Sequence, residues 1–196
     1  MDQAGKRELA MPFGRKSTKP HAFLDEAALH EYALKALGRR MRSESDLRRL
    51  LQAKVEREES GAAKITAVLT RLKEYGYLDD TQFAEAYTRL RQENEKFGQR
   101  RVRQDLSQKG VSQQIIADTI ETRYADVSEE ALARQHLERK RIRKPENEKE
   151  TARVMRRLVT AGFSTGVIYK ILRQWDVPDE TLMALENLSD DEPPAE

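Results

Sequence analysis

Apolar residues recur every three or four positions along most of the chain, a spacing that predicts amphipathic α-helices. In the first such segment Leu29, Ala33 and Ala36 share one face. That segment ends in the cationic run 39–42, which suits a helix C-terminus. No segment alternates apolar and polar residues as a half-buried β-strand would. The pattern therefore predicts an all-α fold.

Capping and stop residues divide this pattern into nine predicted helices. Ser or Asp precedes several apolar segments and Gly or Pro follows them, as expected at helix ends. Ser43 with Asp46 forms a predicted capping box, and Asp79 or Asp80 is predicted to cap the fourth helix. The other predicted caps are Ser112, Ser128 and Ser164, and the predicted stops are Gly76, Gly98, Gly110, Pro145 and Gly162. The pattern also allows a short helix at residues 182–185.

The predicted helices repeat in groups of three. Leu47, Val102 and Val154, at intervals of 55 and 52 residues, are each followed four positions later by a Leu. Gly110 and Gly162 each come four residues after that Leu, and a further apolar pair follows each Gly. Self-similarity at a fixed period is the signature of a repeat architecture.

A unit of about 50 residues buries little apolar surface by itself, whereas stacked units cover one another's cores. We therefore predict three tandem three-helix repeats, at residues 25–77, 78–126 and 127–176, stacked into an elongated, curved body. We expect residues 1–24 to form a flexible basic arm. We expect residues 177–196 to form an acidic, mostly disordered tail.

The composition fits small stacked cores. Charged residues make up 36% of the 196 residues and hydrophobic residues only 38%. The chain has no Cys, which excludes disulfides and thiolate metal sites. No apolar run approaches the roughly 20 residues needed to cross a bilayer. We expect a cytoplasmic monomer that does not bind membranes.

The net charge of +2 conceals a strong division along the chain. Residues 176–196 contain eight acidic side chains and no Lys or Arg, so this stretch carries −8 and leaves +10 for the rest. A basic body favours an anionic partner, which the acidic stretch could mimic or compete with. Improved solubility is an equally good explanation of the acidic stretch.

Runs of Arg and Lys near predicted helix ends are the candidate contacts. The functional interpretation is contact with phosphates or acidic protein surfaces, and the alternative is a solvated helix face paired with Glu. We expect the alternative for scattered cations such as Arg71 and Arg89. In the densest run, 139–144, Glu138 and Glu146 cannot neutralise five cations. The candidate binding residues are Arg39, Arg40, Arg42, Arg48, Arg49, Arg100, Arg101, Arg103, Arg139, Lys140, Arg141, Arg143, Lys144, Arg156 and Arg157.

The sequence contains no pattern typical of an active site. The three His residues lack metal-ligand spacing, and no Gly-rich phosphate loop is present. His136 lies near the apolar face of its predicted helix, which favours a structural role. For Asp79 and Asp80 we favour helix capping over a catalytic carboxylate pair. We expect no catalytic residue, no metal ion and no cofactor.

Four segments, in order, resemble the RecX family. Residues 43–51 (SESDLRRLL) and 76–84 (GYLDDTQFA) resemble the family's Ser-Glu-x-x-Leu-Arg and Gly-Tyr-Leu-Asp-Asp motifs. Residues 98–111 (GQRRVRQDLSQKGV) and 158–168 (LVTAGFSTGVI) are similar to its Lys-Gly-Ile and Gly-Phe-Ser segments. The resemblance covers roughly residues 25–175.

This resemblance implies a regulator, mainly an inhibitor, of RecA recombinase. Such a protein binds the RecA–DNA filament and modulates its ATPase, strand-exchange and coprotease activities in DNA repair and the SOS response. The implied partners are the RecA filament and single- or double-stranded DNA, the latter mainly through phosphates. Two alternatives remain: a general DNA-binding helical module, and a helical-repeat scaffold for protein interactions.

Overall fold

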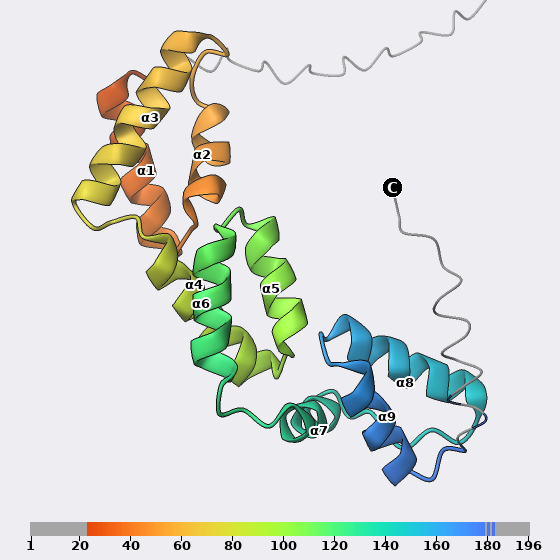
Figure 1. Ribbon diagram of the computed structural model, residues 1–196. Coiled ribbons are helices and arrows are strands. Elements are labelled where there is room, and N and C mark those ends of the chain that lie inside the picture. Colours follow the sequence, from red (N-terminus) through yellow and green to blue (C-terminus); the bar gives the residue numbers. More distant parts are fainter. Residues whose placement is uncertain (1–22, 179, 181, 183–196) are drawn as a thin grey trace, which may run out of the picture.

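The protein is described by a computed structural model that covers residues 23–178, 180 and 182. Within these residues it contains nine α-helices, one π-helical turn and no strand (Figure 1). The prediction of an all-α fold is therefore confirmed. The predicted basic arm, apart from residues 23 and 24, and most of the predicted tail lie outside the described residues. None of the helices in the described part is long and apolar enough to cross a membrane.

The first group of helices comprises α1 (Glu26–Arg39), α2 (Glu44–Gln52) and α3 (Glu59–Glu74). Their apolar faces form one cluster because the buried residues recur at helical spacing. The cluster also takes in Leu78, which follows α3. Its buried members are Leu29, Ala33, Ala36, Leu47, Leu51, Val55, Ile65, Val68, Leu69, Leu72 and Leu78.

The second group comprises α4 (Asp80–Leu90), the π-helical turn η1 (Arg91–Glu95), α5 (Gln99–Gln108) and α6 (Gln113–Tyr124). These helices bury a smaller cluster of their own. Its members are Phe83, Ala84, Val102, Leu106, Val111, Ile116 and Ile120.

The third group comprises α7 (Glu129–Arg139), α8 (Glu148–Thr160) and α9 (Thr165–Gln174). Its core extends past α9, because Val177 and Leu182 are buried in the same cluster. The other members are Leu132, Ala133, Leu137, Val154, Met155, Leu158, Ala161, Phe163, Ile168, Ile171 and Leu172.

Most predicted caps and stops act as expected. The side chains of Ser43, Ser112 and Ser128 each accept a hydrogen bond from the backbone N–H three residues later. Asp79, rather than Asp80, caps α4, since it accepts from the amides of residues 81 and 82. The caps therefore set where these helices begin, as the sequence predicts.

Three predicted helix ends are wrong. The seventh helix ends at Arg139 instead of continuing to Pro145, because Arg141 adopts a left-handed φ of 52°. Gly98 does not stop the fourth helix; α4 ends at Leu90, the π-helical turn continues to Glu95, and Gly98 is the N-cap of α5. Ser164 makes no capping bond, because its hydroxyl donates to Glu129 across the group.

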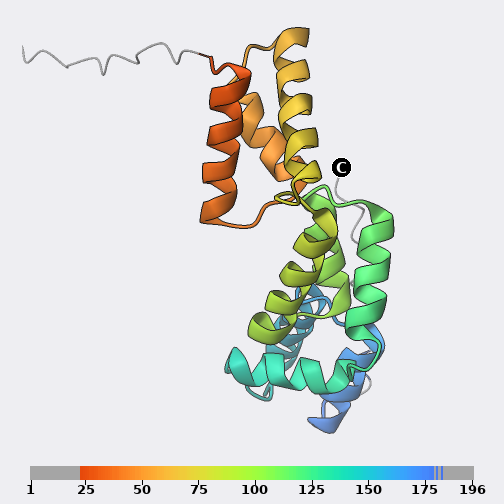
Figure 2. The same ribbon diagram turned by 90° about the vertical axis from the view of Figure 1, so that its left-hand side faces the viewer.

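The three groups follow one another along an elongated, bent body, and the predicted stacking of helical repeats is confirmed (Figures 1 and 2). The extensive helix contacts are all within a group. In both views α7 runs across the direction of α5 and α6, so the body turns at the third group. The exact repeat boundaries stay a prediction.

The joint between the second and third groups is a close backbone contact. The Gly98 amide donates to the Ala161 carbonyl at 2.9 Å. Gly162, with a φ of +90°, lies so close to α5 that a Cβ there would be 2.2 Å from the Arg101 amide nitrogen. The rings of Phe97 and Tyr124 pack against both cores and complete this joint.

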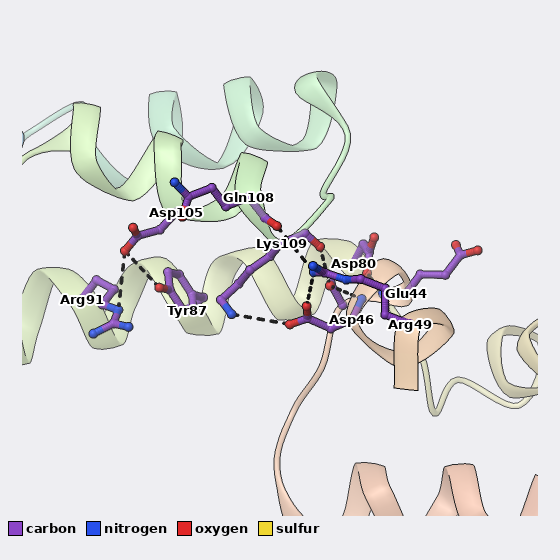
Figure 3. Close-up of polar contacts among 10 residues, drawn as sticks. Glu44, Asp46, Arg49, Asp80, Tyr87, Arg91, Asp105, Gln108 and Lys109 are labelled. Atoms are coloured by element: carbon purple, nitrogen blue, oxygen red, sulfur yellow. Dashed lines mark hydrogen bonds and ion pairs between the residues drawn. The ribbon is translucent and has the colours of Figure 1, made fainter. Parts of the chain in front are cut away.

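The joint between the first and second groups is polar (Figure 3). The Ser43 hydroxyl donates to the Lys109 carbonyl at 2.6 Å, and the Glu44 amide donates to Asp80 at 2.8 Å. Lys109 also pairs with Asp46 at 3.5 Å. Burial raises the pKa of Asp80, whereas the Lys73 ammonium lowers the pKa of Glu44. Asp80 is therefore a joint residue and not a cap.

Replacing Gly162 by Ala should destabilise the protein, because the new methyl group meets the α5 backbone and φ is left-handed. We expect a loss of about 1–3 kcal/mol in the free energy of unfolding. Gly166→Ala is the matched control, since nothing lies within 4 Å of its Cβ position. That variant should be neutral or stabilised by up to about 1 kcal/mol. Urea unfolding followed by circular dichroism measures both, and equal stabilities would contradict the proposed contact.

His136 makes stability depend on pH. It is buried between Phe97 and Phe163, and its Nδ1 donates to the Glu95 carbonyl at 2.9 Å. Burial lowers its pKa below 6.5, so the unfolded chain binds the proton more tightly than the folded chain. The contribution of neutral His136 to the free energy of unfolding is complete above pH 6.5, the pKa of the unfolded chain. It is lost as the pH falls from 6.5 toward the lower pKa of the folded chain.

We therefore expect the free energy of unfolding to decrease between about pH 7.5 and pH 5.5. His136→Asn retains an N–H donor but does not titrate, so this variant should lose most of the decrease. His30→Asn is the control and should keep it. Urea unfolding at each pH measures the effect, and the idea is wrong if the His136 variant keeps the full pH dependence.

Candidate partner-binding groove

A basic groove lies where the third group meets the second. It has a volume of about 680 Å³ and is formed by the start of α5, the end of α7 and the outer face of α8. We call it the interrepeat groove. The lining residues are Phe97, Arg101, His136, Lys140, Ile142, Arg153, Arg156, Arg157, Thr160 and Ala161.

The floor of the interrepeat groove is apolar. Ala161 and the edge of His136 are buried, and Phe97 and Ile142 are half-buried. Phe97 is held from below by Tyr124, whose hydroxyl donates to the Phe97 carbonyl at 2.8 Å. Burial raises the pKa of Tyr124, which keeps this hydroxyl protonated. The floor is thus an apolar surface made largely of loop residues, which packing and this hydrogen bond hold in place.

Three arginines of α8 line one wall. Arg153, Arg156 and Arg157 lie three and four positions apart, so they share one face of the helix. All three are exposed, and none forms an ion pair with a described residue. Their guanidinium groups are therefore available for phosphates or carboxylates, which they bind in bidentate geometry.

The cations of the opposite wall are already paired. Arg101 contacts Asp105 at 2.9 Å and lies over the Phe97 ring at 5.7 Å. Lys140 contacts Glu95 at 3.0 Å and lowers the pKa of that carboxyl group. These pairs fix the direction of both side chains, but they reduce the positive charge on this side.

The structure brings together four of the predicted binding residues. Arg101, Lys140, Arg156 and Arg157 come from three separate sequence runs and meet in the interrepeat groove. Arg153 was missed in the sequence because it stands alone between the apolar residues Ala152 and Val154. Its position three and four residues before the Arg156–Arg157 pair was the available signal.

The other predicted residues lie elsewhere. Arg48 pairs with Glu44, and Arg49 pairs with Asp46 in the polar joint (Figure 3). Lys144 pairs with Asp176 at 2.9 Å, away from the interrepeat groove. The remaining candidates lie at or just after the end of α1, on α5, or around the end of α7 and the turn that follows it. They are Arg39, Arg40, Arg42, Arg100, Arg103, Arg139, Arg141 and Arg143, and their role stays a prediction.

Acidic and imidazole side chains do not gather into a metal site in the described part of the chain. The interrepeat groove also lacks a carboxylate among its lining residues. Its arrangement suits the binding of an anion with apolar parts.

Comparison with known proteins identifies the fold and the family. A family profile described as "RecX, second three-helix domain" matches residues 79–120, which span α4 to most of α6. Two crystal structures share the fold. One is of regulatory protein RecX, with a TM-score of 0.60 and 24% identity over 76% of this chain and 71% of that chain. The other is of RecX from Lactobacillus salivarius, with a TM-score of 0.56 and 19% identity over 77% and 96%.

Several relatives carry the name regulatory protein RecX. The Cronobacter sakazakii protein is 34% identical over 157 residues, which cover 76% of this chain and 92% of the relative. A Thermus thermophilus protein is 33% identical over 150 residues, covering 76% and 91%. The Oceanobacillus iheyensis protein is 32% identical over 148 residues, but the chain spans only about half, 52%, of its length. The chain therefore belongs to the RecX family of regulatory proteins.

Proposed function

We propose that this protein regulates RecA recombinase, mainly as an inhibitor, by binding the RecA–DNA filament. It lowers the ATPase, strand-exchange and coprotease activities of the filament in DNA repair and the SOS response, without chemistry of its own. Membership of the RecX family supports a regulatory role. The observation that carries the contact itself is the interrepeat groove, where three arginines without an ion pair to any described residue lie beside an apolar floor.

The groove and the shape of the body together suit a filament. A filament presents phosphates and acidic side chains at regular intervals, and arginine recognises both. An elongated repeat body offers an extended surface rather than a deep pocket. The polar and apolar joints fix the three groups relative to one another, so several contacts can form at once.

A general DNA-binding module is the second candidate, favoured by the same three arginines of α8. Phosphate contacts alone would then supply the affinity, and DNA without RecA would be bound as tightly as the filament. A regulator of the filament binds the filament more tightly than bare DNA. The two candidates therefore differ in the ratio of these affinities.

Reversing two charges of the interrepeat groove should weaken inhibition. At equimolar protein we expect the unaltered chain to slow DNA-dependent ATP hydrolysis by RecA. The Arg156→Glu, Arg157→Glu variant loses charge-assisted contacts of about 1.5–3 kcal/mol each, so it should need more than about tenfold higher concentration. The measurement is a titration of the steady-state ATPase rate.

The matched control reverses Arg71 and Arg89, two exposed arginines outside the groove. This variant has the same net charge as the groove variant and should inhibit like the unaltered chain. No inhibition by the unaltered chain would refute the regulatory proposal. An equal loss of inhibition in the two variants would show that inhibition depends on net charge and not on the groove.

Binding to bare DNA should be weak and strongly dependent on salt. For a single-stranded 20-nucleotide DNA we expect the slope of log K against log salt to fall by about 1.4 in the groove variant, about 0.7 for each lost phosphate contact. Fluorescence anisotropy at several salt concentrations measures this slope. Binding of bare DNA as tight as that of the filament would favour the DNA-binding module.

A further inference from the structure

The lining of the interrepeat groove is complementary to a ligand that has both anionic and apolar groups. Its wall carries Arg153, Arg156 and Arg157 without partners among the described residues, while its floor is Phe97 and Ile142. A bare polyanion would satisfy the arginines and leave the floor uncovered. An acidic peptide with leucine side chains would cover both, since arginine binds carboxylates and the floor buries apolar groups.

The chain itself contains such a peptide. Residues 183–196 include five carboxylates and no Lys or Arg, and three large apolar side chains lie among them. The carboxylates are Glu186, Asp190, Asp191, Glu192 and Glu196, and the apolar residues are Met183, Leu185 and Leu188. The charge and the apolar content of this acidic segment thus complement those of the groove.

The acidic segment starts at the third group, which also provides most of the groove. Leu182 is buried in the core of the third group, and α8 belongs to that core while its outer face forms the groove wall. Fourteen residues can extend to about 46 Å, and α8 with 13 residues is about 20 Å long. The segment is therefore long enough to reach any part of the groove.

Asp176, an acidic residue seven positions before this segment, already contacts the cationic run 139–144. Asp176, which follows α9, accepts a hydrogen bond from Lys144 at 2.9 Å, and this contact lowers the pKa of Asp176. Lys144 belongs to the cationic run 139–144, and Lys140 of the same run lines the groove. This pair lies away from the groove, so it shows only that the cationic run attracts an acidic residue of the chain after α9.

We infer that the acidic segment 183–196 binds in the interrepeat groove of its own chain, with its carboxylates on Arg153, Arg156 and Arg157. This occupancy regulates the groove to which the proposed function assigns partner binding, so its significance rests on that function. A tethered segment has an effective concentration of about 1 mM, so a Kd of about 0.1 mM keeps roughly nine-tenths of the grooves occupied. An external partner then binds about tenfold more weakly.

A spin label on the acidic segment tests the contact directly. Because the chain has no Cys, Ser189→Cys gives a single attachment site for a nitroxide. We expect the label to abolish the amide signals of Phe97, Thr160 and Ala161 in NMR spectra of the full chain. The signals of Gly38 and Val68, in the first group, should keep their intensity. Reduction of the nitroxide should restore the lost signals.

The matched control carries the same label with Arg156→Glu and Arg157→Glu, and in it the groove signals should return. If that variant is not folded by circular dichroism, 1 M salt replaces it, since the Debye length falls to about 3 Å. Unchanged groove signals in the unaltered chain overturn the inference. A loss of amide signals confined to Asn147 and Trp175 also overturns the inference, because it would place the segment beside Lys144. RecA and DNA are both absent, so the result is independent of the proposed function.

Discussion

The stacking of this molecule depends on one hydrogen bond to a loop carbonyl that occurs at both joints. The loop between the second and third helices of one group meets the start of the second helix of the group before. At the first joint the Lys109 carbonyl accepts the Ser43 hydroxyl, and at the second the Ala161 carbonyl accepts the Gly98 amide. Gly follows the accepting residue in each case, and a Cβ on either Gly would collide with the facing helix. The Gly that ends a helix thus also lets two groups touch.

The surroundings of this contact give each joint its own properties. At the first joint the neighbours are charged and partly exposed, so ion pairs such as Lys109 with Asp46 add orientation more than stability (Figure 3). At the second joint Phe97 and Tyr124 pack against both cores, and His136 is buried beside them. Apolar burial contributes most of the free energy of such contacts. The groove therefore forms at the apolar joint, on a floor that the fold keeps in place.

Local structure could be predicted from the sequence and the contacts between groups could not. Ser43, Ser112 and Ser128 cap their helices because capping depends on three or four neighbouring residues. The repeat was visible because each group uses the same apolar spacing. The sequence predicts Asp79 or Asp80 as the cap of the fourth helix; Asp79 takes that role, and Asp80 binds the Glu44 amide 36 residues away. No pattern within one helix reports such a partner.

The basic residues show why a dense run in sequence is not a dense patch in space. The run 139–144 was the strongest candidate, but α7 ends at Arg139 and the chain then turns. Lys140 faces the groove while Lys144 pairs with Asp176, so the run is divided between two surfaces. The arginines of α8 are sparser in sequence, and helical periodicity places them on one face. Since that face is opposed by α5 and α7, the positive groove requires both groups, and neither group alone could form it.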